Sequence, residues 1–367
     1  MDILIVAMEA SGDQHGAAVL QALRRRNPHL RAWGVGGPAL RRGGLRAIAH
    51  AETLSAMGVG DVLRHVPRLL RLRQHLLHLA RRRPPALALL CDAPDFNLPL
   101  GHRLRLRATP VVMLVAPQAW AWRPERARTM PDEVDLLLTL FPFEPAFFRR
   151  YGVPTEFIGH PLATRRLTRS PDSPPTLALL PGSRPAELQR HLPVMLQARR
   201  RLEQLLPTNT TVLAAAPTLD PRHIHDLLGS AHQDVEVLSG ARAALQRASL
   251  AIVVSGTASL EAALAEVPAV VVYRTDRLTW EIGRRLVKTP HIAMPNILHD
   301  GPRLFPELLQ RDVTPARIVQ AAREVLRRAP SIGAGLRGVA AKLQPPPPWT
   351  EPAEHAAELI WEVIQRG

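Results

Sequence analysis

The stretch MDILIVAMEASGD, residues 1–13, decides the fold class of this 367-residue chain. Its apolar run Ile3–Ala7 is short and continuous, which is typical of a strand buried on both faces of a sheet. Small and polar residues follow, and a segment with helical periodicity covers Gly16–Arg26. A strand that leads through a tight turn into a helix predicts a parallel sheet with helices on both faces.

The same strand–turn–helix unit recurs along the rest of the chain. Helical periodicity predicts further helices over Glu187–Leu206 and Ala258–Ala265. We therefore predict the α/β class, with two Rossmann-like, doubly wound parallel-sheet domains that face each other across a cleft at the carboxyl ends of their strands. The other apolar runs interpreted as strands are Ala86–Leu90, Val111–Val115, Leu136–Leu140, Leu177–Leu180, Val212–Ala216, Val235–Leu238, Leu250–Val254 and Ala269–Tyr273.

Two proline-rich breaks divide the chain, SPDSPP at residues 170–175 and QPPPP at residues 344–348. They predict a first domain over residues 1–168 and a second over residues 176–343. A final helix, about Glu351–Gln365, then lies in residues 349–367 and docks either on the first domain or on a partner chain. The length agrees with two domains and a tail, at roughly 150 residues per domain.

The chain is strongly basic, with 47 Lys+Arg against 32 Asp+Glu and a formal net charge of +15. Lys288 and Lys342 are its two lysines, so nearly all the positive charge is arginine. Such a surplus fits nucleic acid, an anionic membrane surface or phosphorylated substrates, and an arginine-rich genome explains it as well. No run of six basic residues occurs, which disfavours a nucleic-acid-binding tail.

Other features exclude whole classes of protein. The single cysteine, Cys91, excludes an intrachain disulfide and a cysteine-based metal site, and we interpret it as a core residue. The N-terminus lacks the basic region of a signal peptide, and no segment approaches the ~20 apolar residues of a membrane span. Neither a D-x-D pair nor an H-E-x-x-H motif occurs, so we expect no catalytic metal and no cofactor.

Polar residues follow the first two predicted strands at the edge where a site would form. Glu9 comes after the first strand and is expected to project into the cleft, while Ser11 or Asp13 caps the helix that follows. The stretch CDAPDFN, residues 91–97, places two carboxylates and an amide after the next strand. A carboxylate there with a raised pKa would suit a general base, and a structural Asx-turn is the alternative.

Two other motifs in the first half are less specific. The stretch APQAWAWR, residues 116–123, sets Trp120 and Trp122 beside Arg123, which indicates a site or an interface, with simple packing as the alternative. The glycine-rich stretch GVGGP, residues 34–38, lacks the spacing of a dinucleotide-binding loop.

The second half carries two candidate phosphate loops. LPGSR, residues 180–184, ends one strand, so Ser183, nearby backbone amides and Arg184 are placed to meet an anion. SGTASLE, residues 255–261, repeats the arrangement and adds Glu261 for a ribose diol. Simple helix capping explains either loop alone, but two of them in one domain predict a site for a nucleotide diphosphate.

A basic amphipathic segment covers residues 61–83, with Pro67 near its start. Its apolar residues recur at helical spacing among several arginines, so it either packs on the sheet or enters a membrane interface. The residues expected to face the membrane are Val62, Leu63, Val66, Leu69 and Leu70.

Taken together, these motifs resemble the lipid-A-disaccharide synthase family, which are inverting glycosyltransferases of the GT-B fold. The resemblance runs in order over nearly the whole chain. The residues that carry it are EASGD (9–13), GGP (36–38), LSAMG (54–58), DAPDFN (92–97), WAWR (120–123), LFPFE (140–144), FIGH (157–160), LPGSR (180–184), SGT (255–257), Glu261 and PN (295–296).

The resemblance implies transfer of 2,3-diacylglucosamine from UDP-2,3-diacylglucosamine to the 6-hydroxyl of 2,3-diacylglucosamine 1-phosphate (lipid X), with inversion. It implies that Asp92 is the general base, with Glu9 and Asp95 also at the catalytic centre. The implied UDP-sugar site comprises Gly182, Ser183, Arg184, Ser255, Gly256, Thr257, Glu261 and Asn296. The implied acceptor side comprises Ser11, Asn97, Gln118, Trp122 and Arg123.

The resemblance also implies a cytoplasmic protein held peripherally at the anionic face of the inner membrane. We expect no nucleic-acid partner and consider a homodimer. Two positions depart from the family pattern: Met8 stands where a glycine is usual, and Pro67 interrupts the amphipathic segment. Two other functions stay open, namely another UDP-sugar enzyme of this fold, such as an epimerase, and a non-catalytic nucleic-acid or membrane-binding module.

Overall fold

The computed structural model describes residues 1–55, 62–165, 167, 174–202, 210–216, 219–287 and 289–366. The chain divides into two compact units, Met1–Thr164 with Leu343–Gly367 and Arg165–Lys342. Most of the predicted linker at 170–175, and most of the LSAMG motif at 54–58, lies outside the described residues.

The first unit is built on a seven-stranded sheet in the order β3-β2-β1-β4-β5-β6-β7, and every described pair is parallel. Its strands are β1 (Asp2–Ala7), β2 (Arg31–Gly36), β3 (Arg46–His50), β4 (Leu87–Cys91), β5 (Val111–Leu114), β6 (Leu136–Thr139) and β7 (Thr155–Phe157). Its helices are α1 (Ala10–Arg26), α2 (Pro38–Arg42), α3 (Glu52–Ser55), α4 (Val62–Arg82), α5 (Pro94–Arg105), α6 (Ala119–Trp122), α7 (Glu144–Arg149) and α16 (Pro352–Arg366), with 3-10 turns η2 (Pro124–Arg128) and η3 (Met130–Asp132).

Strand β1 shows why its residues are continuously apolar. Ile3 and Ile5 point into one hydrophobic core, while Leu4 and Val6 point into another on the opposite face. All four side chains are fully buried, so both faces of the strand need apolar residues.

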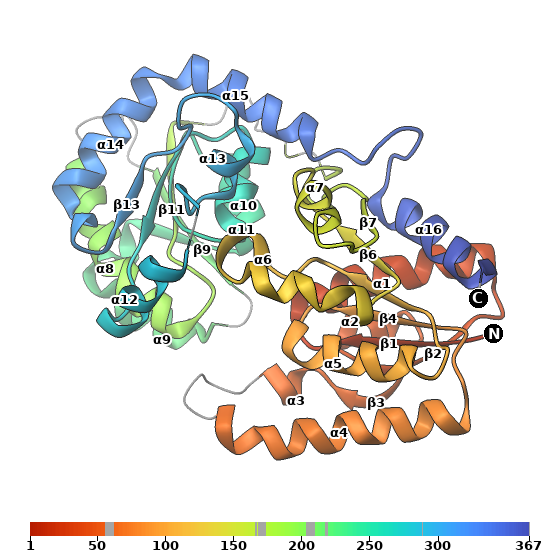
Figure 1. Ribbon diagram of the computed structural model, residues 1–367. Coiled ribbons are helices and arrows are strands. Elements are labelled where there is room, and N and C mark those ends of the chain that lie inside the picture. The colour runs from red at the N-terminus through yellow and green to blue at the C-terminus, as the bar shows by residue number, and fades with distance from the viewer. Residues whose placement is uncertain are drawn as a thin grey trace. The chain divides into compact units, whose positions relative to one another are not determined.

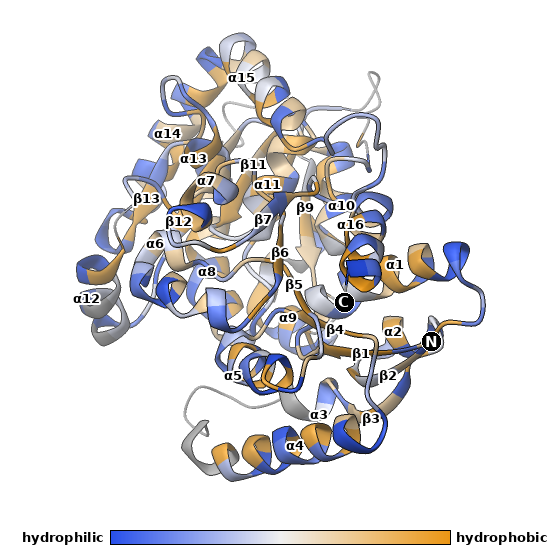
Figure 2. Ribbon diagram, turned by 45° about the vertical axis from the view of Figure 1, so that its right-hand side comes forward, coloured by the Kyte–Doolittle hydropathy of each residue, from blue (hydrophilic) through white to orange (hydrophobic). Residues whose placement is uncertain are grey.

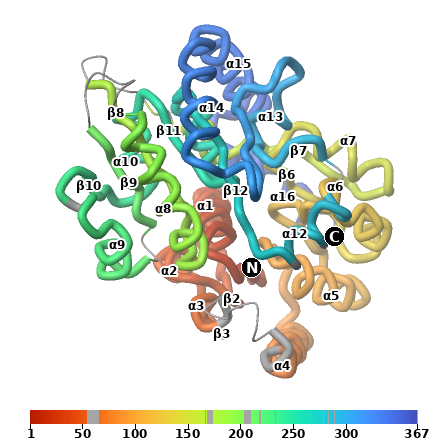
Figure 3. Tube along the Cα trace, turned by 90° about the vertical axis from the view of Figure 1, so that its left-hand side faces the viewer, coloured from red at the N-terminus to blue at the C-terminus, as the bar shows by residue number. Residues whose placement is uncertain are grey.

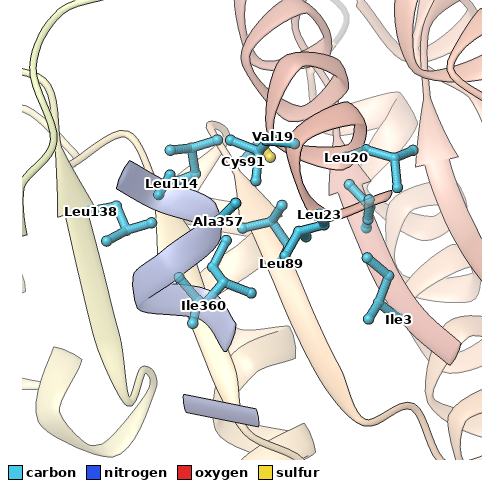
Figure 4. Close-up of a cluster of buried hydrophobic side chains, with 14 of the residues drawn as sticks. Ile3, Val19, Leu20, Leu23, Leu89, Cys91, Leu114, Leu138, Ala357 and Ile360 are labelled. Atoms are coloured by element: carbon cyan, nitrogen blue, oxygen red, sulfur yellow. The ribbon is translucent and has the colours of Figure 1, made fainter. Parts of the chain in front are cut away.

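Helices from the two ends of the chain cover one face of this sheet. Helix α16 packs beside α1 (Figure 1). Ala357 and Ile360 of α16 are fully buried in one cluster with Leu23 and Leu89 (Figure 4). Arg25 and Arg26 of α1 add ion pairs to α16 through Glu354 and Glu358. The first unit therefore takes its core from both ends of the chain.

Helix α4 has one buried and one exposed side. Leu76 and Ala80 are buried against the sheet, and Leu69 packs at the edge of the same core. Val66 and Leu70 are 39% and 42% exposed, and apolar and polar residues alternate along the helix (Figure 2). Pro67 lies within the helix. The side chains of Val62 and Leu63 lie outside the described part of the structure.

The second unit has a six-stranded sheet in the order β10-β9-β8-β11-β12-β13, again parallel at every described pair. Helices α8 and α14 lie side by side along it (Figure 3). The strands are β8 (Thr176–Leu180), β9 (Thr210–Ala215), β10 (Val235–Ser239), β11 (Leu250–Val254), β12 (Ala269–Tyr273) and β13 (Glu307–Leu309). The helices are α8 (Pro185–Leu202), α9 (Pro221–Leu228), α10 (Gly240–Arg247), α11 (Thr257–Leu264), α12 (Arg277–Leu286), α13 (Met294–Leu298), α14 (Pro315–Arg327) and α15 (Ala329–Lys342), with 3-10 turns η4 (Gly229–Gln233) and η5 (Gln310–Asp312).

The predicted α/β class with two doubly wound parallel sheets is confirmed. Four strands, β2, β3, β7 and β13, fall outside the runs interpreted as strands, because they are short or mix apolar residues with glycine and charged residues. No helix among the described residues is both long enough and apolar enough to cross a bilayer.

One local prediction is wrong. Helix α1 begins at Ala10, so Ser11 and Asp13 lie inside it and neither caps it. Its N-cap is Glu9, which makes no side-chain capping hydrogen bond. The two backbone amides directly before α1 instead donate to a carboxylate from another segment, which is described next.

Candidate active site

A pocket of about 320 Å³ opens in the first unit, beyond the carboxyl ends of β4 and β5. Parallel strands end at one edge of the sheet, so residues that follow different strands meet there. Six residues predicted for the site from the sequence line this pocket: Glu9, Asp92, Asp95, Gln118, Trp122 and Arg123. The other lining residues are Ala93, Pro94, Val115, Ala116, Pro117, Ala119 and Arg126.

The turn that presents Asp92 has an unusual backbone. Asp92 and Ala93 have φ values of 57° and 37°, in the left-handed region that residues with a Cβ rarely adopt. The fully buried Asn97 supports this turn, because its Nδ2 donates to the carbonyl oxygens of Cys91 and Asp92, each at 2.9 Å. Asn97 therefore supports the turn and is not among the residues that line the pocket.

The Asp92 carboxylate accepts the two backbone amides that directly precede α1. Its Oδ1 accepts the backbone N–H of Met8 and its Oδ2 that of Glu9, both at 3.0 Å. A Cβ on Gly12 would collide with Oδ2, so only glycine lets the helix approach this closely. Met8, the residue that departs from the family pattern, supplies one of the two donors and buries its side chain in the core.

The pKa of Asp92 is raised to about 7: burial is the main cause, the two backbone hydrogen bonds oppose it, and the nearby charges of Glu9 and Asp13 add to it. A carboxyl group that titrates near neutral pH exchanges protons readily at physiological pH. Asp92 is only 8% exposed but faces the pocket. The arrangement thus suits a general base.

Asp13 has a structural role next to this site. Its carboxylate accepts backbone N–H groups of Gly37, Ala39 and Leu40 at 2.7, 2.8 and 3.0 Å, and so caps α2. A Cβ on Gly37 would lie 2.6 Å from Asp13 Oδ2, which accounts for glycine in the GVGGP loop. Ser11 is exposed on the first turn of α1 and is not among the residues that line the pocket.

The opposite wall of the pocket carries tryptophan and arginine. The Arg123 guanidinium lies over the Trp122 ring, 4.6 Å from its centroid. Arg126 pairs with Asp95, whose side chain is 77% exposed. Val115, at the end of β5, has a φ of 73°, so a second strained backbone position borders the pocket.

The sequence assigned no role to Glu144, although the structure connects it to this wall. Glu144 is 3% exposed, and its Oε1 accepts the indole N–H of Trp120 at 3.1 Å. Burial raises the pKa of Glu144 to about 8. The sequence signal that could have singled out Glu144 is an acidic residue that follows β6 within a run of aromatic residues.

In the second unit, the LPGSR loop follows β8. Gly182 has a φ of 111°, and Glu187 folds back so that its Oε2 accepts the backbone N–H groups of Ser183 and Arg184 at 3.0 and 3.3 Å. The two amides predicted to meet an anion therefore bind a carboxylate of the chain itself. The Arg184 side chain is 81% exposed, with Nη1 3.7 Å from Glu187 Oε1.

The SGT loop follows β11 and leads into α11. Gly256, the N-cap, has a φ of 145°, and no side chain caps α11. The Ser255 hydroxyl donates to the carbonyl oxygen of Ile292 at 2.9 Å. Thr257 is exposed at the start of the helix. Burial raises the pKa of Glu261, and the nearby charge of Arg242 partly offsets that rise.

Asn296 is 4% exposed and bonds only within its own unit. Its Nδ2 donates to Phe305 O at 2.8 Å and to Glu307 Oε1 at 2.7 Å, and its Oδ1 accepts from Leu304 and Phe305. These bonds use every hydrogen-bonding position of the amide, so Asn296 orders the backbone around α13. Within the described ranges, no group of three or more His, Cys, Asp or Glu side chains could hold a metal ion.

Known proteins with similar sequences point in one direction. A family model described as lipid-A-disaccharide synthetase matches residues 3–331. A lipid-A-disaccharide synthase of Anaeromyxobacter dehalogenans (strain 2CP-C) is 44% identical over 337 residues, 88% of each chain. Another from Myxococcus xanthus (strain DK1622) is 39% identical and covers 100% of this chain and 98% of the relative.

Among solved structures, the fold resembles the glycosyltransferase of kitacinnamycin, with a TM-score of 0.65. The likeness covers 99% of each chain at 17% identity, so it supports the fold and not a substrate.

Proposed function

Because this chain belongs to the lipid-A-disaccharide synthetase family of glycosyltransferases, we propose that it joins two acylated glucosamine units. The donor is UDP-2,3-diacylglucosamine, and the acceptor is the 6-hydroxyl of 2,3-diacylglucosamine 1-phosphate. The products are the disaccharide 1-phosphate and UDP. The observation that carries the proposal is the Asp92 carboxyl group, buried beside a pocket with a pKa of about 7.

In the proposed reaction, Asp92 takes the proton from the acceptor 6-hydroxyl. The oxygen then bonds to the anomeric carbon of the donor on the face opposite to UDP, and the bond from that carbon to the phosphate oxygen breaks. UDP leaves with the electron pair, so the configuration inverts. Gln118, Trp122 and Arg123 line the same pocket and are proposed to contact the acceptor, with Arg123 supplying positive charge for its phosphate.

The second unit is proposed to bind UDP. The positive end of the α11 dipole, which no side chain caps, favours a phosphate, and the exposed Arg184 guanidinium adds a cation that neutralises the leaving group. Glu261 is proposed to accept hydrogen bonds from the ribose. Asn296 is not included among the ligands, because its hydrogen bonds are already used within the unit.

Turnover of the two lipid substrates, measured as UDP release without added metal, tests the reaction. We expect the wild type to be active and Asp92→Asn to lose at least about 100-fold in kcat, because the amide cannot accept the proton. Asp132→Asn, in the same unit but away from this pocket, is the control. An Asp92→Asn variant as active as the wild type would contradict the role of Asp92. Equal turnover of UDP-sugars without acyl chains would point to a different enzyme of this fold.

We also propose that α4 touches an anionic membrane surface, on the side where Val66 and Leu70 are exposed near Arg68 and Arg71. The double variant Val66→Ser/Leu70→Ser should bind phosphatidylglycerol vesicles severalfold more weakly than the wild type. Leu106→Ser is the control, since Leu106 is 68% exposed on another helix end of the same unit. Unchanged binding of the double variant would contradict this part of the proposal. A homodimer stays a prediction.

A further inference from the structure

The pocket wall that includes α6 lacks support of its own. Helix α6 has four residues, Ala119–Trp122, no side-chain cap, and irregular backbone at the residues on either side. A helix of one turn does not persist in water by itself. Nevertheless, Gln118, Ala119 and Trp122 all line the pocket that contains Asp92. Their positions must therefore be set by contacts behind the helix.

Ala119 and Ala121 of α6 are buried, and Trp120, which is not among the pocket-lining residues, links the helix to another segment. The Trp120 ring meets Phe143 edge to face, with ring centroids 4.8 Å apart. Its indole N–H donates to Glu144 Oε1 at 3.1 Å, and it is half-buried. The other carboxylate oxygen, Oε2, accepts the backbone N–H of Phe141 at 3.1 Å. One buried carboxylate thus joins α6 to the segment after β6.

A role within the Phe141–Glu144 turn alone explains the hydrogen bond to Oε2 but not the one to Oε1. The Phe141–Glu144 turn is closed by Oε2 and by a reciprocal bond from Glu144 N to Phe141 O at 3.2 Å. A carboxyl group that is 3% exposed is costly to bury, and an apolar residue of similar volume would fill the space at lower cost. What the carboxyl group adds is a second oxygen, Oε1, that accepts from a donor on a different segment.

We propose that Glu144 is a positioning residue for the acceptor pocket: through Trp120 it holds α6 so that Gln118 and Trp122 stay oriented toward the site of Asp92. This inference rests on the proposed function, because it takes the pocket as the acceptor site. Glu144 acts through Trp120 and α6, and is not among the residues that line the pocket.

Three variants test it: Glu144→Gln, Trp120→Phe and the double variant. Glutamine keeps the volume but has one acceptor oxygen for two donors, and phenylalanine keeps a ring but has no N–H. Each single variant should raise KM for the acceptor about fivefold, the loss expected for one buried hydrogen bond. We expect KM for the donor and kcat to stay within about twofold, since UDP is bound by the other unit. The double variant should be no worse than the singles, because both remove one bond.

Hydrogen exchange provides a readout that does not depend on substrates. The amides of Ala121 and Arg123 bond within the α6 segment, to Gln118 and Ala119. Exchange at residues 118–123 should accelerate in Glu144→Gln and Trp120→Phe and stay unchanged in Glu156→Gln, the control on β7. The melting temperature shows whether each variant is folded.

Several outcomes would overturn the inference. Additive effects of the two substitutions, or equal losses for both substrates, would indicate a general structural defect instead. Unchanged exchange at residues 118–123 would show that Glu144 does not hold α6. Absence of turnover in the wild type would contradict the proposed function, and the exchange result would still decide the role of Glu144.

Discussion

At the scale of single residues, the candidate site depends on the backbone conformation of Asp92 and on the absence of a Cβ at Gly12. Asp92 has a left-handed backbone conformation, and its carboxylate accepts the two amides that directly precede α1. Those bonds are possible because residue 12 is glycine. The Asp92 side chain could be singled out from the sequence, because a carboxylate directly after a buried strand is uncommon. The residues that donate to Asp92 could not be singled out from the sequence, because Met8 and Glu9 donate through their backbone amides.

The pH dependence of turnover follows from Asp92. Its pKa of about 7 means that protonation removes the proton acceptor below neutral pH. We expect kcat/KM for the acceptor to fall about tenfold for each pH unit below that value. His160, whose pKa burial lowers to about 3, stays neutral over this range and adds no step of its own. A profile measured from pH 5 to 9 checks this, and a flat acidic limb would contradict it.

Gly12 gives a second test at this scale. In Gly12→Ala, the added methyl group collides with Asp92 Oδ2, so the carboxylate must leave its two amide donors. We expect the loss of about 2 kcal/mol or more in unfolding free energy and a large loss of turnover. Gly338→Ala, at a position in α15 where a Cβ meets nothing, is the control and should be neutral or stabilising. Denaturant titration and UDP release measure both quantities, and equal behaviour of the two variants would contradict the expectation.

At the scale of elements, both units satisfy helix N-termini in ways that the linear motif does not reveal. The sequence predicts that Ser11 or Asp13 caps its own helix, but Asp13 caps α2, and Asp92 accepts the two amides that directly precede α1. In the second unit, the amides of LPGSR bind Glu187, four residues after Ser183. A strand–loop–helix motif therefore predicts where backbone amides are placed to bind an anion. It does not predict which group accepts their hydrogen bonds.

Glu187→Ala tests the occupancy of that loop. The variant loses the carboxylate that accepts two amides, and we expect it to be destabilised by about 1 kcal/mol. We also expect UDP to raise its melting temperature more than that of the wild type, because phosphate oxygens accept the amides that are freed. Glu281→Ala removes an exposed ion-pairing carboxylate from α12 and serves as the control. Weaker stabilisation of Glu187→Ala by UDP would show that phosphate does not use these amides.

At the scale of the whole molecule, the first unit is assembled from both ends of the chain. Helix α16 follows the second unit in sequence but contributes Ala356, Ala357 and Ile360 to the core of the first. The stability of the candidate acceptor pocket therefore depends on residues more than 200 positions away from Asp92 in the sequence. The apolar period of the last helix indicated that it must dock, but not on which surface.

Ile360→Ala measures that dependence. Ile360 is fully buried, so truncation should cost about 2–5 kcal/mol through lost burial and a cavity. Tryptophan fluorescence during denaturant unfolding reports mainly on the first unit, because Trp280 is the one tryptophan of the second. Gln365→Ala, exposed on the same helix, should change stability by less than about 0.5 kcal/mol. A loss below about 1 kcal/mol for Ile360→Ala would show that α16 contributes little to this core.

The sequence by itself determined the α/β class, most of the strands that are buried on both faces and the edge where the candidate site lies. These features depend on local periodicity and on what directly follows each strand, and both are properties of neighbouring residues. Only the tertiary structure decided that Gly12 must be glycine for Asp92 to fit, that Asn97 supports a strained turn, that Glu144 holds α6 and that α16 completes the first unit. Except for the bonds of Asn97 within its own turn, these are contacts between segments distant in sequence, so the residue is determined by burial and close approach and not by the local pattern.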